Sequence, residues 1–203
     1  MLKFADDTVI VSLLVNEETS HGPVVEDFVS WCAKCNLSLN ISKTKDMIID
    51  FGKSAISVSP TVINGRDIEF VDEYRYLGTV IDNKLNFNAN TDAICKKVQQ
   101  RMFFLRKMNS FKVCSVLMTL FYQSFIESVI SYCDIVWFHC ISLSNRKRLW
   151  WIVRTSVRIT GTCLPTLQEL YSSRVSKRAG RIILDPSHPD LFLIELLPSG
   201  RRY

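Results

Sequence analysis

The sequence has no apolar run long enough to cross a bilayer. Its most apolar stretch, residues 113–143, is interrupted by the carboxylates Glu127 and Asp134, whereas a spanning helix needs about 20 predominantly apolar residues. Asp6 and Asp7 also break the first apolar run, so no cleavable signal peptide opens the chain. We therefore expect an intracellular protein without a membrane partner, and the sequence does not distinguish the nucleus from the cytoplasm.

The chain lacks a clustered pattern of the residues that build metal or redox sites. His21, His139 and His188 are far apart in sequence and show no triad or ligand pattern. Seven cysteines, an odd and scattered number, fit reduced thiols better than a disulfide framework. Cys32-x-x-Cys35 has the spacing of a zinc pair, but structural zinc needs four ligands and no second pair lies nearby. Both cysteines fall on the apolar stripe of a predicted helix, which favours buried thiols.

A nucleotide-binding loop is missing as well. The tripeptide Gly52-Lys53-Ser54 ends like a phosphate-binding loop, but Met47 stands where the first glycine of that loop is required. We therefore expect no small-molecule cofactor.

What the chain does have is a strongly uneven charge. Residues 1–92 carry a net charge of −6, residues 93–143 carry +4 and residues 144–203 carry +7, which gives +5 overall. An acidic front and a basic rear suggest that the rear faces a polyanion, although a solvated basic surface has the same composition. With 47% hydrophobic and 22% charged residues, the composition is that of a globular protein.

Hydrophobic periodicity predicts an α+β protein in which strands come first and helices follow from about residue 90. Asn64-Gly65 is the strongest turn signal, because both central residues of a type I′ hairpin need positive φ. Ser144 is the predicted cap of the third rear helix and Gly161 its stop, and the tail from Asp185 is expected to be irregular. The predicted strands cover residues 2–5, 8–15, 47–51, 61–63, 66–71 and 74–81. The predicted helices cover residues 23–36, 93–108, 113–140 and 144–160.

Phe4-Ala5-Asp6-Asp7 places two like charges side by side between two apolar strands. Such a pair is tolerable in a tight turn, where both side chains reach water or a cation. Mg²⁺ is held by carboxylates together with substrate phosphates, and two such ions stabilise both oxygens of a phosphoryl transfer. Taken alone, the dipeptide is explained as well by an acidic hairpin turn.

The wider context resembles the reverse transcriptases of non-LTR (LINE-type) retrotransposons. Aromatic-Ala-Asp-Asp between strands resembles their catalytic hairpin, and Asn40-Ile41-Ser42-Lys43-Thr44 resembles their Asn-x-x-Lys-Thr signature. Residues 74–78, with the sequence YRYLG, resemble the primer-grip turn, and residues 103–108 with the following helices resemble the thumb. The closing segment of such reading frames is resembled by five stretches, namely Leu164-Pro165, Glu169-Leu170-Tyr171, Asp185-Pro186, His188-Pro189 and residues 197–203. The resemblance implies a partial palm over 1–89, a helical thumb over 90–143 and a basic helical segment with a tail over 144–203.

The resemblance also implies roles for individual residues. Asp6 and Asp7 would be ligands of Mg²⁺, and Lys43 would lie near the leaving pyrophosphate as a proton donor. Tyr76-Leu77-Gly78 would hold the primer 3′ end, and basic side chains would contact an RNA or DNA template–primer duplex. The predicted nucleic-acid contacts are Lys96, Lys97, Arg101, Arg106, Lys107, Arg154 and Arg158.

The departure from that family concerns the metal site. A complete enzyme has fingers and a further metal-binding aspartate on an upstream strand, and this chain starts just before the hairpin. We therefore expect a truncated remnant that binds Mg²⁺ weakly or not at all and is inactive in isolation. A longer copy of the same element could be its partner. The resemblance further predicts that the 2–12 hairpin and the 74–82 strand share one sheet, with Asp6 and Asp7 exposed at its rim.

Residues 94–134 resemble a second family, the helical module at the N-terminus of AlkB homologues that modify tRNA. The oxygenase chemistry of that family needs two histidines and a carboxylate around Fe(II), and residues 94–134 contain no histidine. We therefore expect that an oxygenase or methyltransferase activity inherited from that family name would lack the catalytic residues it needs. The alternative interpretation is a helical RNA- or protein-binding module over residues 90–160. In it Trp150 and Trp151 beside Arg154 could stack on bases, although core packing of at least one tryptophan is predicted.

Overall fold

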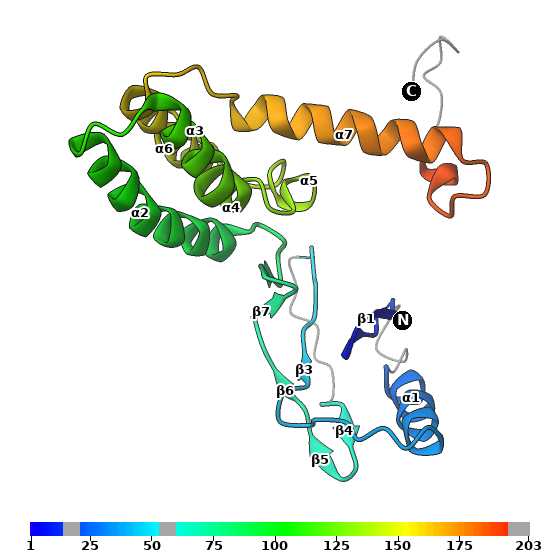
Figure 1. Ribbon diagram of the computed structural model, residues 1–203. Helices are drawn as coiled ribbons and strands as arrows, with labels where there is room; N and C mark the ends of the chain where they lie inside the picture. Colours follow the sequence, from blue (N-terminus) through cyan, green and yellow to red (C-terminus); the bar gives the residue numbers. More distant parts are fainter. Residues whose placement is uncertain (14–20, 53–59, 195–203) are drawn as a thin grey trace. The chain divides into compact units, whose positions relative to one another are not determined.

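The computed structural model describes residues 1–13, 21–52 and 60–194 (Figure 1). It confirms the predicted α+β class. The chain forms two compact units, Met1–Leu85 and Asn86–Tyr203. The first unit contains the strands and one helix, and the second contains helices in its described part.

The strands of the first unit pair as four separate two-stranded sheets, β1 with β2, β3 with β6, β4 with β5 and β7 with β8. All pairs are antiparallel except β3 with β6, which is parallel. The elements are β1 (Leu2–Phe4), β2 (Asp7–Val9), α1 (Gly22–Lys34), β3 (Lys45–Asp46), β4 (Val62–Ile63), β5 (Arg66–Asp67), β6 (Glu69–Phe70), β7 (Glu73–Tyr76) and β8 (Thr79–Asp82).

The turns between these strands follow from residues with positive φ. Asn64 and Gly65 have φ of 50° and 72°, which confirms the predicted hairpin. Leu77 and Gly78 have φ of 46° and 87° and join β7 to β8. The prediction of one strand over 74–81 is therefore wrong, because two consecutive left-handed residues reverse the chain. Glycine adopts this region freely, whereas leucine there costs about 1 kcal/mol.

Two further strand predictions are corrected. The β1–β2 hairpin and the β7–β8 hairpin belong to different sheets, so the expected shared sheet is wrong for the described residues. The ladders are short, and each strand finds its partner across its own turn rather than in the distant hairpin. The predicted strand over 47–51 is absent, because Asp50 turns the chain by accepting a hydrogen bond from the Gly52 backbone N–H at 2.6 Å.

A small apolar core holds α1 against the β4–β5 hairpin. Its buried members are Val25, Ile63 and Ile68. Helix α1 carries Pro23 in its first turn, as predicted, because proline lacks an N–H that would be unsatisfied there. Partly buried side chains that extend this core are Ile10, Val29, Leu39 and Ile41.

The end of α1 separates the two cysteines of its sequence motif. Cys32 is buried, as predicted, but Cys35 is exposed. The helix ends at Lys34, and Asn36 takes a left-handed φ of 54° that turns the chain away. The prediction of a buried thiol at Cys35 is therefore wrong.

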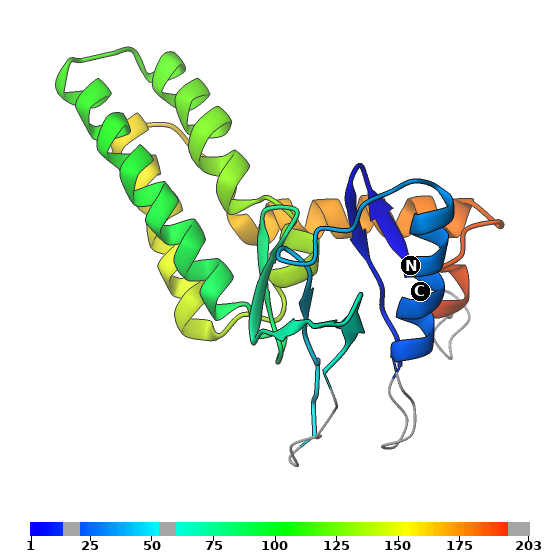
Figure 2. The ribbon, with the colours of Figure 1, turned by 90° about the horizontal axis from the view of Figure 1, so that it is seen from below.

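The second unit is built around the long helix α2, which contacts α6, α3, η1 and α4 (Figures 1 and 2). No helix in the described ranges combines the length and apolar character of a bilayer-spanning segment. The elements are α2 (Asn88–Ser110), α3 (Ser115–Phe121), the π-helix η1 (Tyr122–Glu127), α4 (Ser128–Ile130), α5 (Asp134–Trp137), α6 (Leu143–Thr160), α7 (Leu167–Leu184) and the 3₁₀ helix η2 (Leu191–Leu193).

Helix α2 confirms the periodicity that predicted it. Ile94, Val98, Met102 and Leu105 are buried at helical spacing, and the opposite face is exposed. Helix α6 packs on the buried face, and Ser156 of α6 donates a hydrogen bond to the Met102 sulfur at 3.3 Å. This pairing forms the main contact between helices of the unit.

The predicted single helix over 113–140 is wrong. The chain instead passes through α3, η1 and α4, and Cys133 then takes a left-handed φ of 51° before α5. The indole N–H of Trp137 donates to the Tyr132 carbonyl at 2.8 Å. The Tyr132 carbonyl lies two residues beyond the end of α4 and thus receives a donor from α5, which connects the two sides of the break.

The caps of the last two long helices are set by side-chain oxygens. Ser142, rather than the predicted Ser144, caps α6 by accepting from the Asn145 N–H at 3.2 Å, and Gly161 ends it as predicted. Helix α7 begins with a capping box of Thr166 and Glu169. This T-x-x-E signature was present in the sequence but was not used to predict a separate helix.

Candidate functional site

The Asp pair lies where the sequence placed it. Ala5 and Asp6 form the turn between β1 and β2, and Asp7 pairs with Phe4 in the last rung of the ladder. Both carboxylates are exposed. The described residues contain no group of three or more His, Cys, Asp or Glu side chains that could hold a metal.

The loop that follows α1 is ordered by the Asn40 side chain. Its amide oxygen accepts from the Ser42 hydroxyl at 2.7 Å and from the Lys43 N–H at 3.2 Å. The Thr44 hydroxyl donates to the Asn40 carbonyl at 2.9 Å. These bonds leave the Lys43 side chain exposed. No interaction within the described ranges links Lys43 to the Asp pair.

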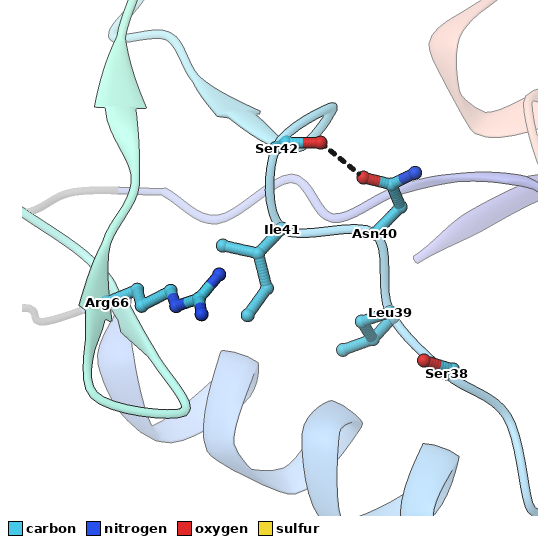
Figure 3. A pocket seen from close by; sticks show the side chains of 6 residues that line it. All are labelled: Ser38, Leu39, Asn40, Ile41, Ser42 and Arg66. Carbon is cyan, nitrogen blue, oxygen red and sulfur yellow. Dashed lines mark hydrogen bonds between the residues drawn. The ribbon is translucent and has the colours of Figure 1, made fainter.

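A shallow pocket of about 370 Å³ adjoins this loop. In Figure 3 the Arg66 side chain extends from β5 toward Ile41, across the pocket from Asn40. The lining residues are Ser38, Leu39, Asn40, Ile41, Ser42 and Arg66. One cation and three small polar groups suit a weakly held anion, and no second feature of the pocket points to a particular ligand.

The predicted primer-grip residues form the β7–β8 turn. Tyr76 is the last residue of β7 and pairs with Thr79, so Leu77 and Gly78 lie at the tip. Tyr76 and Leu77 are half-buried and Gly78 is exposed. Because this hairpin and the Asp hairpin are separate sheets, no backbone ladder brings the two predicted sites together.

Basic side chains of α2 line its exposed face. Lys96, Lys97, Arg106 and Lys107 are exposed, and the Lys107 ammonium lies 5.9 Å from the centroid of the exposed Phe103 ring. The predicted contact residue Arg101 is half-buried and donates to the Phe125 carbonyl of η1. Arg101 therefore contributes to helix packing as well as to the charge of the face.

The exposed face of α6 carries both aromatic and basic side chains. Trp150 and Trp151 are 44% and 52% exposed, and the Arg154 guanidinium lies 4.8 Å and 5.6 Å from their ring centroids. Lys147 and Arg158 continue the row at helical spacing and are exposed. We call Lys147, Trp150, Trp151, Arg154 and Arg158 the α6 stripe.

The prediction that one tryptophan packs in the core is wrong. The apolar run LWWIV extends around more of the helix than the neighbouring helices cover. Within this run Leu149 and Val153 are buried, and Trp150 and Trp151 are exposed. The two indoles instead contact each other edge to face, with centroids 5.1 Å apart. Their exposure therefore places two stacking surfaces beside three cations.

The other two basic side chains of α6, Arg146 and Arg148, interact with other parts of the protein. Arg146 donates to the His139 carbonyl at 2.7 Å, and Arg148 forms an ion pair with Asp92 at 2.6 Å. Helix α6 contains no acidic residue. Within the described residues no carboxylate forms a salt bridge with the three cations of the α6 stripe.

A polar cluster lies inside the second unit and was not predicted. Asp134 has a side chain that is 1% exposed and is paired with Arg174 at 2.9 Å. Arg174 also donates to the Ser131 hydroxyl at 3.0 Å and to the Ser131 carbonyl. Nearby, burial raises the pKa of Glu127, against the opposing effect of Arg174. Burial and Glu127 together raise the pKa of the Tyr122 hydroxyl. Arg174 therefore provides the positive charge opposite the buried Asp134 carboxylate.

Comparisons with known proteins found a similarity for one segment of the chain. Residues 87–128 match one family model. Its description is alkylated DNA repair protein alkB homolog 8, N-terminal. The match covers 42 of the 203 residues and spans α2, α3 and η1. No curated protein and no solved structure matches the chain.

The match agrees with the predicted resemblance of residues 94–134 to the AlkB-homologue module over most of that range. None of the comparisons supports the resemblance to reverse transcriptases. The α6 stripe lies beyond the matched residues, and so do the Asp hairpin, the Asn40 loop and the β7–β8 turn. The closing segment at 197–203 and residues 53 and 54 of the rejected phosphate loop lie outside the described residues.

Proposed function

We propose that the helical unit, residues 86–203, is a nucleic-acid-binding module. The observation that carries the proposal is the α6 stripe, in which exposed indoles and cations without acidic partners share one helix face. Nucleic-acid-binding surfaces combine cations for phosphates with aromatic rings for bases. The exposed lysines and arginines of α2 add charge that attracts a polyanion without reading its sequence.

The family match supports this interpretation over the polymerase. The matched segment is helical, lies within the proposed module and is described as part of a DNA repair protein. The proposal concerns binding alone, since the described residues contain no group of three or more His, Cys, Asp or Glu side chains that could hold a metal, and the triplet His188-Pro189-Asp190 belongs to no such group. A purely protein-binding module is the competing form of the same interpretation, and the following test distinguishes them.

The logarithm of the binding constant of the full chain for a labelled DNA duplex should fall linearly with the logarithm of the salt concentration. Each phosphate contact contributes about −0.9 to the slope for a duplex. The variant Lys96→Ala/Lys97→Ala should therefore weaken binding and reduce the magnitude of the slope by up to about 2. Fluorescence anisotropy titrations at several salt concentrations measure both quantities.

The matched control is Lys3→Ala/Lys34→Ala, which removes two exposed lysines from the acidic unit. This variant should keep the slope of the parent chain. Absence of binding at low salt, or equal losses in the two variants, would reject the module and favour a protein partner.

A second candidate is the remnant of a LINE-type polymerase, with a template–primer duplex as ligand and Mg²⁺ as ancestral ion. The confirmed β1–β2 hairpin, with Asp6 and Asp7 exposed at its turn, favours it. The separate sheets of the two hairpins count against it.

The polymerase candidate predicts no independent catalysis. Purified chain incubated with an annealed primer and template, nucleotides and Mg²⁺ or Mn²⁺ should give no extension, because the Asp pair does not make a complete metal site. Gel analysis of the labelled primer measures this. The Asp6→Asn/Asp7→Asn variant is the control, and extension by the parent chain but not by this variant would overturn the prediction.

A further inference from the structure

We infer that the α6 stripe binds unpaired bases, so that the ligand class of the module is single-stranded nucleic acid. This inference rests on the proposed function and goes further by naming the strand state. Two observations carry it, namely the geometry of Trp150, Trp151 and Arg154 and the absence of acidic residues from α6.

The arrangement of the rings suits stacking on bases. Trp150 and Trp151 are about half exposed and meet edge to face, so part of each indole surface is accessible to a planar ligand. The Arg154 guanidinium lies over both rings and adds a second planar, cationic surface. Base–aromatic stacking needs unpaired bases, because the bases of a duplex already stack on one another.

The cations of the α6 stripe are spaced so that they can bind the phosphates of a single strand. Lys147 and Arg158 flank the aromatic centre and lie about 17 Å apart along the helix axis. With Arg154 they supply three cations that have no carboxylate partner among the described residues. A strand can therefore lie along α6 with its bases on the indoles and its phosphates on the cations. Since bases and phosphates are common to RNA and DNA, both strands should bind alike.

A lipid surface is the rival occupant, because basic helices with tryptophan also bind membranes. Such helices present a broad apolar face to the bilayer. The apolar face of α6 is instead buried against α2, through Leu149 and Val153. The two indoles remain exposed beside the Arg154 guanidinium, and this mixed aromatic and cationic surface suits a planar base better than acyl chains.

The test uses the full chain and two labelled probes, a single strand of about 12 nucleotides, within the site size of single-strand-binding proteins, and a duplex of equal length. The parent chain should bind the single strand more tightly than the duplex, with quenching of tryptophan fluorescence. Trp150→Ala/Trp151→Ala should lose about tenfold or more of its single-strand affinity and change its duplex affinity less than about threefold. RNA and DNA versions of the strand are compared directly.

Two controls separate stacking from folding. Trp31→Ala removes an exposed tryptophan of the acidic unit and should leave both affinities unchanged. Trp150→Phe/Trp151→Phe keeps the aromatic faces and should retain most of the single-strand affinity. Circular dichroism should give the parent spectrum for all three variants, since the replaced side chains are exposed.

The outcomes distinguish failure of the inference from failure of the proposed function. If the parent chain binds duplex and the alanine variant keeps its single-strand affinity, the α6 stripe is not the site, but the module still binds nucleic acid. If the parent chain binds neither probe, both proposals are wrong. Quenching by anionic phospholipid vesicles, without binding of either oligonucleotide, would assign the stripe to membranes and overturn the inference.

Discussion

Replacing Arg174 by methionine should lower the free energy of unfolding by about 3 kcal/mol. The Asp134 carboxylate that it pairs with is almost completely buried, and Arg174 is also the donor to the Ser131 hydroxyl. The Arg174 side chain is 40% exposed, but its removal leaves the buried Asp134 carboxylate desolvated without compensation, and this penalty exceeds the value of the contact itself. Chemical denaturation of the full chain, followed by circular dichroism, measures the change.

The matched control is Arg178→Met on the same helix, where the side chain is exposed. It should change the unfolding free energy by less than about 0.5 kcal/mol. The double variant Asp134→Leu/Arg174→Met should recover much of the loss, because neither charge is then left buried alone. Equal effects of Arg174→Met and Arg178→Met would show that the pair does not stabilise the unit.

Replacing Trp137 by alanine should lower the unfolding free energy by about 3–5 kcal/mol. Trp137 is the largest of the fully buried side chains, and its indole N–H supports the break before α5 by donating to Tyr132. The substitution creates a cavity and leaves a carbonyl without its donor, and the two effects have the same sign. Thermal and denaturant unfolding of the full chain measure the loss.

Trp151→Ala is the comparison for this variant, because it removes the same side chain from an exposed position on α6. It should cost less than about 1 kcal/mol, since little buried surface is lost. If the two tryptophan variants were equally destabilised, the assignment of Trp137 to the core and of Trp151 to the surface would be incorrect.

The sequence correctly predicted the elements whose structure depends on residues close together in the chain. Asn64-Gly65 specified a hairpin because few dipeptides adopt two positive φ angles, and Gly161 specified a helix end for the same reason. The spacing of Ile94 to Leu105 specified one face of α2. Each of these features depends on residues within a few positions of one another, so the sequence was sufficient.

The sequence predicted the residue types of the candidate site on α6 but not which of its side chains are exposed. The run LWWIV is apolar on more than one face of its helix, so periodicity could not determine whether Leu149 or Trp150 would be buried. That choice depends on contacts with α2, whose residues lie some 50 positions earlier, as the Ser156–Met102 hydrogen bond illustrates. The sequence therefore predicted aromatic and basic side chains together but not their exposure.

The Asp134–Arg174 pair shows the same limit more strongly. Its partners are 40 positions apart, and the sequence around either residue does not indicate which residue it pairs with. The predicted single helix over 113–140 would have placed Asp134 on a regular helix surface. The break at Cys133 instead turns it toward α7, so an error in one element concealed a contact between two.

The π-helical turn η1 changes the faces that the chain presents on its two sides. A π-turn contains one more residue than the α-turn that it replaces. Because each residue of an α-helix turns by about 100°, the residues of α4 are rotated by about that angle relative to a regular continuation of α3.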